Sequence, residues 1–171
     1  MPVQRLNHAV LFVRDVDASV EFYSSALGFR LVTGVPGQMA FLQAEGSTND
    51  HDLGLFAGGA DAEPSRAGRG TVGLYHLAWE VDTLGELQRI AGVLREQGAL
   101  AGASDHGSTK ALYAHDPDGI EFEVSWLVPA DRLGQDTGLR TAPLDLDAEI
   151  ARYGADLRGG LGVSVPAAAT G

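Results

Sequence analysis

The chain has 171 residues and no cysteine, which excludes disulfides, thiolate metal sites and cysteine nucleophiles. With 12 Lys or Arg against 23 Asp or Glu, its formal net charge is −11, and no Lys/Arg cluster offers a surface for nucleic acid. No apolar stretch is long enough to cross a bilayer and the N-terminus does not resemble a signal peptide, so we expect a cytoplasmic protein without membrane partners.

The first predicted elements follow the order β-α-β-β-β. An alternating apolar run over residues 6–13 predicts a strand. The following residues have helical spacing from Asp17, a good N-cap, to Gly28, a good C-cap. Three more strands are then predicted at residues 29–33, 39–43 and 53–56.

The same order is repeated after a connector. Residues 58–71 are rich in Gly, Ala and charged residues, a composition that predicts the connector between the two repeats. The alternating run over residues 74–81 then matches the first run at an offset of 68 residues. A helix is predicted from Asp82 or Thr83 to Gly98. Three strands follow at residues 100–103, 110–115 and 120–126.

The repeat predicts an α+β fold with two βαβββ modules, at about residues 5–57 and 72–128. These modules, within residues 1–129, would form a curved, mostly antiparallel sheet around a cavity. Residues 130–171 are expected to be a C-terminal extension, irregular at first, with a short helix at about residues 144–153 and a disordered tail.

Two histidines occupy equivalent places in the repeat. His8 and His76 are each the third residue of a predicted strand, so an axis relating the modules would bring them together. Glu123 lies in the middle of the last predicted strand. Two imidazoles and one carboxylate form a facial triad that leaves positions open for substrate and, in iron enzymes, for O2. Each residue alone is explained as well by an ordinary core or surface position, but the repeated histidine favours a metal-centred cavity.

Three segments resemble the vicinal-oxygen-chelate superfamily, which includes glyoxalase I, extradiol dioxygenases and bleomycin-resistance proteins. They are LNHAVLFVRDVDASVEFYSSALGF, YHLAWEVDT and DPDGIEFEV, and the likeness covers about residues 5–128. The resemblance implies that His8, His76 and Glu123 are the metal ligands. Because many members of the family are homodimers, it also implies a homodimer here.

A narrower resemblance lies in the stretch DHGSTKALYAHDPDG, which is similar to single-domain catechol 2,3-dioxygenases. It implies an oxidoreductase that opens a small catechol-like aromatic substrate with O2, using Fe(II) or alternatively Mn(II). His106 and Tyr113 would then hydrogen-bond substrate or oxygen. The structural alternative is that Tyr113 fills the floor of the cavity and His106 caps a loop.

Two other functions stay open. A glyoxalase-like isomerase, epimerase or thiol transferase would use Zn(II), Ni(II) or Mn(II) as a Lewis acid. Glyoxalases carry a fourth carboxylate ligand, for which Asp52 is the only acidic candidate. A drug-binding resistance protein would need no metal, and the presence of all three ligands argues against it.

The remaining histidines are given structural roles. Extradiol enzymes have another histidine shortly before the second ligand, and the stretch GRGTVGLY has none. His51 precedes a predicted strand and is expected to be a turn residue, although it could approach the cavity. His115, beside the Asp-Pro turn, is expected to lie on the surface.

Overall fold

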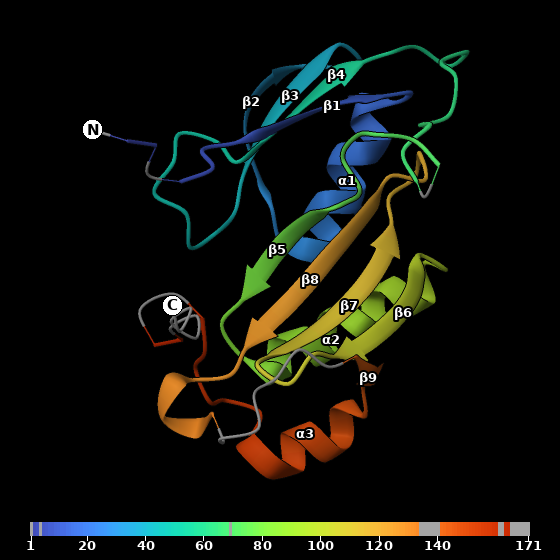
Figure 1. Cartoon of the computed structure of the whole chain (residues 1–171). Coiled ribbons are helices and arrows are strands. Elements are labelled where there is room, and N and C mark those ends of the chain that lie inside the picture. Colours follow the sequence, from blue (N-terminus) through green and yellow to red (C-terminus); the bar gives the residue numbers. More distant parts are fainter. Residues whose placement is uncertain (1, 4, 69, 134–140, 161–162, 165–171) are drawn as a thin grey trace. The chain divides into compact units, whose positions relative to one another are not determined.

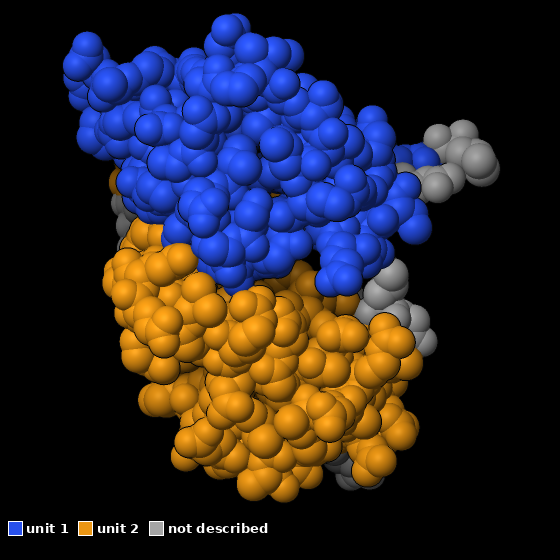
Figure 2. Space-filling model, turned by 180° about the vertical axis from the view of Figure 1, so that it is seen from behind, with its two compact units in different colours: residues 1–66, 116–119 blue, residues 67–115, 120–171 orange. Residues whose placement is uncertain are grey.

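The computed structural model describes the chain except residues 1, 4, 69, 134–140, 161–162 and 165–171. It divides into two compact units (Figure 1, Figure 2). The first contains Met1–Arg66 and Asp116–Gly119, and the second contains Ala67–His115 and Ile120–Gly171. No helix in the described part of the chain has the length and apolar character of a membrane span.

The first unit contains one helix and a four-stranded sheet in the order β1-β4-β3-β2. Strands β1 and β4 are parallel, and the other neighbours are antiparallel. The helix begins after the N-cap Asp15, whose carboxylate accepts a hydrogen bond from the Ala18 N–H, and ends at Gly28. The elements are β1 (Ala9–Val13), α1 (Val16–Leu27), β2 (Arg30–Val35), β3 (Met39–Gln43) and β4 (Leu53–Ala57).

The second unit repeats this topology in the order β5-β8-β7-β6-β9, with β5 and β8 parallel. Helix α2 begins after Thr83, whose side chain accepts from the Glu86 N–H, and packs its apolar residues into the core. The elements of the repeat are β5 (Leu77–Val81), α2 (Leu84–Glu96), β6 (Leu100–Asp105), β7 (Thr109–His115) and β8 (Glu121–Leu127). The predicted α+β fold with two βαβββ modules is therefore confirmed.

Two details of the prediction are wrong. The first helix is capped by Asp15 and not by Asp17, because the Asp15 side chain reaches the open N–H of the first turn. His8 and His76 each lie one residue before their strand, since β1 and β5 begin at Ala9 and Leu77. The partner β4 begins only at Leu53, so residues before Ala9 have no strand to pair with.

The C-terminal extension contains a short turn and a short strand in addition to the helix that was expected at about residues 144–153. It forms a 3-10 turn η1 (Ala130–Arg132), a short strand β9 (Ala142–Pro143) and α3 (Leu146–Tyr153), capped by Asp145. Strand β9 pairs with the edge strand β6, and a two-residue strand has no periodicity that a sequence pattern could show. The predicted disordered tail lies largely on residues outside the described part of the chain.

A fully buried lysine connects α3 to the sheet of the second unit. Lys110 Nζ lies 2.6 Å from Asp105 Oδ1 on β6 and 2.9 Å from Glu149 Oε2 on α3. Next to it, the rings of Trp126 and Tyr153 have centroids 5.5 Å apart. The extension is thus held by a buried ion-pair network and by aromatic packing.

The first unit contains a buried tyrosine, Tyr23, which is expected to make the stability of the fold sensitive to alkaline pH. The Tyr23 hydroxyl donates to Asp116 Oδ2 at 3.1 Å, and burial, followed by the Asp116 charge, raises the pKa of Tyr23 far above its usual value. The neutral phenol therefore stabilises the fold fully below about pH 10, the ordinary tyrosine pKa, and this stabilisation is lost as the pH rises above it.

We expect Tyr23→Phe to flatten the fall in the free energy of unfolding above about pH 10. Urea denaturation followed from about pH 8 to about pH 11 measures this slope. Tyr75→Phe is the matched control, because Tyr75 is 57% exposed and its replacement should leave the slope unchanged. If the free energy of unfolding fell equally with pH in Tyr23→Phe and in the wild type, Tyr23 would not be the source of the alkaline sensitivity.

Candidate active site

The register of the second sheet brings four predicted site residues onto adjacent strands. Tyr113 on β7 lies directly opposite Glu123 on β8. On its other side β8 pairs with β5, and His76 immediately precedes β5. His106 follows the end of β6, which pairs with β7.

His76 and Glu123, two of the three predicted metal ligands, lie side by side in the second unit. His76 Nε2 lies 3.2 Å from Glu123 Oε2, and both side chains are mostly buried. The other ring nitrogen, Nδ1, is buried without a hydrogen-bond partner among the described residues, and Glu121 Oε1 is 3.6 Å away. Two ligand atoms that each lie about 2.1 Å from one ion at a right angle are about 3 Å apart. This pair therefore fits a divalent cation, with Glu121 as an outer partner for the imidazole.

His106 and Tyr113 form a second pair in the same unit. His106 Nε2 lies 2.9 Å from the Tyr113 hydroxyl, and the rings of Tyr113 and His76 have centroids 5.8 Å apart. Burial, and then the charge and hydrogen bond of Glu123, raise the pKa of Tyr113 above its usual value. The phenol therefore stays protonated at neutral pH and can donate a hydrogen bond.

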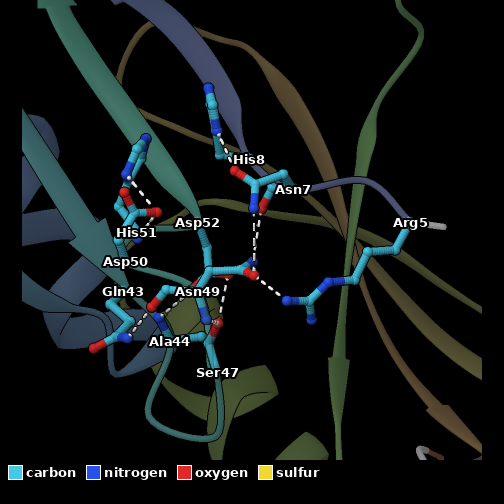
Figure 3. A network of polar contacts seen from close by, with 10 residues as sticks. All are labelled: Arg5, Asn7, His8, Gln43, Ala44, Ser47, Asn49, Asp50, His51 and Asp52. Atoms are coloured by element: carbon cyan, nitrogen blue, oxygen red, sulfur yellow. Dashed lines mark hydrogen bonds and ion pairs between the residues drawn. The ribbon is translucent and has the colours of Figure 1, made fainter. Parts of the chain in front are cut away.

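His8 belongs to the first unit, where an amide network orients its ring (Figure 3). Its Nδ1 lies 2.7 Å from Asn7 Oδ1. The Asn7 amide nitrogen faces Asn49 Oδ1, so Asn7 presents its oxygen to the ring and His8 Nδ1 must carry the proton. Asn49 is itself held by Arg5 and by the Asn7 carbonyl. His8 Nε2 is thereby left with the lone pair that a metal ligand needs.

The remaining histidines are placed differently. The ring of His51 lies beside that of His8, with centroids 4.5 Å apart, and also contacts Phe41 at 4.9 Å. Its Nδ1 lies 3.2 Å from Asp50 Oδ1. His51 is therefore a neighbour of His8 and more than a turn residue. The side chain of His115 is 47% exposed, as predicted for a surface residue.

Asp52, the acidic candidate for a fourth metal ligand, forms its hydrogen bonds within a loop. Its carboxylate accepts hydrogen bonds from Ala44 N at 2.9 Å, Ser47 Oγ at 2.7 Å and Asn49 Nδ2 at 2.7 Å (Figure 3). These three bonds stabilise the turn between β3 and β4 and occupy most of the acceptor sites of the carboxylate.

The strand register shows which residue of the first module lies at the position equivalent to Glu123. In the second module Glu123 pairs with Ala78, and the equivalent pair in the first module is Val10 with Gly54. A Cβ at Gly54 would lie 3.3 Å from Val10 Cγ2 and 3.5 Å from a ring carbon of Phe41. The first module therefore has no carboxylate at the place that corresponds to Glu123.

The three predicted metal ligands are divided between the units: His8 lies in the first, and His76 and Glu123 in the second. Within the described residues, no group of three or more His, Asp or Glu side chains is gathered closely enough to hold a metal ion. The structure brings together His76, Glu123, His106 and Tyr113, and it brings His8 together with His51.

Sequence reasoning missed the residues that orient the predicted ligands. Asn7 and Asn49 are 42 residues apart, and Glu121 is one of two acidic residues on β8. No motif joins Asn7 to Asn49, because their contact depends on a loop whose path is not visible in the pattern. Glu121 did leave a signal, since it lies two residues before Glu123 on one strand and alternation places both side chains on one face.

The family model described as Glyoxalase/Bleomycin resistance protein/Dioxygenase superfamily matches residues 5–124. The chain is 35% identical to Biphenyl-2,3-diol 1,2-dioxygenase 3 of Rhodococcus globerulus over 121 residues, which are 70% of this chain and 62% of that protein. It is 31% identical to Catechol-2,3-dioxygenase of Bacillus subtilis over 122 residues, which are 70% of this chain and 40% of that protein. The match thus spans less than two thirds of either relative.

Solved structures have the same fold. A glyoxalase/dioxygenase from Nostoc punctiforme superposes with a TM-score of 0.59 and 26% identity, covering 71% of this chain and 90% of that one. A glyoxylase/bleomycin resistance protein/dioxygenase domain from Frankia sp. EAN1pec reaches a TM-score of 0.63 at 20% identity, covering 75% of this chain and 96% of that one. Together with the family match and the repeated βαβββ topology, these likenesses show that the chain belongs to the glyoxalase/bleomycin resistance protein/dioxygenase superfamily.

Proposed function

We propose that the chain is a metal-dependent extradiol-type dioxygenase that opens the ring of a small catechol-like aromatic with O2. The observation that carries the proposal is the cluster in the second unit, where the His76–Glu123 pair lies beside the His106–Tyr113 pair. Two relatives, at 35% and 31% identity, are named as dioxygenases of diols or catechol, which supports the same activity.

The proposed metal ligands are His8, His76 and Glu123, and the proposed metal is Fe(II). An iron ion held by two imidazoles and a carboxylate would bind the two vicinal oxygens of the substrate and keep a position for O2. The Asn7 contact prepares His8 for this role by holding a proton on Nδ1. Glu121, near His76 Nδ1, is placed to do the same in the second unit.

The chemistry also needs groups that hold and move protons. A catechol loses hydroxyl protons when it binds through both oxygens, and the ring-opened product needs one returned. His106 is placed to carry that proton, because its Nε2 faces the Tyr113 hydroxyl. Tyr113, protonated at neutral pH, donates a hydrogen bond that orients a substrate oxygen. Both atoms of O2 enter the product, one ring C–C bond breaks, and no external reductant is consumed.

A Lewis-acid reaction on the same fold is the competing function. Glyoxalase-type isomerases are expected to use a carboxylate as a fourth protein ligand of the metal. This chain has Gly54 at the corresponding place, and the carboxylate of Asp52 accepts hydrogen bonds within the turn before β4. The vacant fourth protein position favours a site that binds substrate and O2 together.

Oxygen consumption tests the proposed function. The full chain is reconstituted anaerobically with Fe(II) and mixed with catechol and with biphenyl-2,3-diol, while O2 uptake and the yellow ring-opened product are followed. We expect uptake of one O2 per substrate with Fe(II) and none with Zn(II). Absence of uptake across a broad panel of diols, or O2-independent turnover with Zn(II) or Ni(II), would contradict the proposal.

Replacing the proton carrier should separate catalysis from metal binding. We expect His106→Ala to keep its iron and to lower kcat by about 10²-fold to 10⁴-fold, the usual contribution of a general acid or base. The matched control is His115→Ala, since that side chain is 47% exposed. Elemental analysis and O2 uptake measure the two quantities, and loss of iron in His106→Ala would show that His106 has been assigned the wrong role.

A further inference from the structure

The C-terminal extension reaches the proposed active site through one hydroxyl group. Strand β9 pairs with β6 so that Ala142 lies opposite Asp105. Continuing this antiparallel register by one residue places Thr141 opposite His106. Thr141 Oγ1 lies 3.3 Å from His106 Nδ1, the ring nitrogen that faces away from Tyr113.

The direction of the hydrogen bonds follows from the role proposed for Tyr113. Its hydroxyl has one proton, which the proposed function directs at a substrate oxygen. The Tyr113 oxygen then accepts from His106 Nε2–H, 2.9 Å away. In that tautomer His106 Nδ1 is an acceptor, and the Thr141 hydroxyl faces it as a donor.

We propose that Thr141 is a positioning residue that holds the His106 ring with its Nε2–H directed at Tyr113. This inference rests on the proposed function, because the Nε2 proton is the one that we assign to catalysis. Thr141 acts through His106 and has no role of its own in contact with substrate.

The extension is anchored firmly enough to perform this task. Lys110 is fully buried and joins Asp105, the residue before His106, to Glu149 on α3. Gln88 on α2 donates to Asp147 on α3 at 3.0 Å. The segment that carries Thr141 is therefore fixed on the sheet at β9 and again at α3. All of it lies beyond residue 124, where the family match ends.

Two variants of the full chain test the proposal. Thr141→Val keeps the shape of the side chain and removes the donor, whereas Thr141→Ser keeps the donor. Their His106 ring nitrogens are first observed by ¹⁵N NMR without metal, so that this readout does not depend on activity. We expect the wild type and Thr141→Ser to show one protonated Nε2 and a hydrogen-bonded Nδ1, and Thr141→Val to show a shifted Nδ1 signal.

Kinetics of the iron-loaded variants with catechol give the second readout. We expect kcat to fall about tenfold in Thr141→Val with KM unchanged, and to be restored in Thr141→Ser. A proton on Nδ1 in the wild type, or a Thr141→Val variant with unchanged Nδ1 signal and unchanged kcat, would overturn the proposal. If the wild type consumes no O2 with any diol, the proposed function fails, and the NMR experiment still decides the Thr141 contact.

Discussion

Removing either proposed metal ligand of the second unit is expected to abolish metal binding. Glu123→Ala takes away the carboxylate that lies 3.2 Å from His76 Nε2, and His76→Ala takes away the imidazole. Loss of an outer partner of a ligand already costs about 10-fold to 100-fold in metal affinity, so loss of a ligand itself should cost more than about 100-fold. The iron-to-protein ratio after anaerobic reconstitution and desalting measures this effect.

Two further variants make the result specific. Glu121→Gln keeps both ligands and changes only the group 3.6 Å from His76 Nδ1, so its affinity should fall by about 10-fold to 100-fold. Glu86→Gln, at a side chain that is 38% exposed on α2 and pairs with Arg89, should retain the wild-type ratio. Full iron content in both His76→Ala and Glu123→Ala would mean that the metal is held elsewhere.

Replacement of the buried lysine of the second unit is expected to have the largest effect on the stability of the fold. Lys110→Met leaves the Asp105 and Glu149 carboxylates buried without their shared cation. Breaking a buried ion pair by removing one partner costs about 3–5 kcal/mol, because the remaining charge is not compensated. We expect a loss of this size in the free energy of unfolding, measured by urea denaturation.

The control for burial is an ion pair on the surface. Arg89 and Glu86 on α2 form a contact of 2.6 Å, but their side chains are 44% and 38% exposed. Solvent screening limits such a pair to about 0–1 kcal/mol, so Arg89→Ala should change stability by no more than that. If Lys110→Met does not fold, Glu149→Gln gives a second measurement of the same network. Equal effects of Lys110→Met and Arg89→Ala would contradict the structural role of the network.

The repeat made the fold predictable from the sequence. The match of residues 6–13 with residues 74–81 identified two modules, and alternation within each run identified strands that the structure confirms at Ala9–Val13 and Leu77–Val81. Apolar periodicity also identified both long helices. Helix capping was less predictable, because Asp15 and Asp17 are both suitable N-caps and only the path of the backbone chooses between them.

The site was predictable only for residues whose types are chemically unusual at their positions. A histidine repeated in two modules and a glutamate on an apolar strand stand out, and so do His106 and Tyr113 once a motif joins them. Thr141 and Asn49 do not stand out, because polar residues in loops are common. Their contacts arise from β9 and from the turn before β4, and neither is encoded by periodicity.

The most direct test of the proposed site is anomalous diffraction at the iron edge from crystals of the Fe(II)-loaded chain. We expect one strong peak per chain, within about 2.0–2.3 Å of a ring nitrogen of His8, a ring nitrogen of His76 and a carboxylate oxygen of Glu123. A peak that is bound by other residues, or one that lacks His8 among its neighbours, would contradict the proposed site.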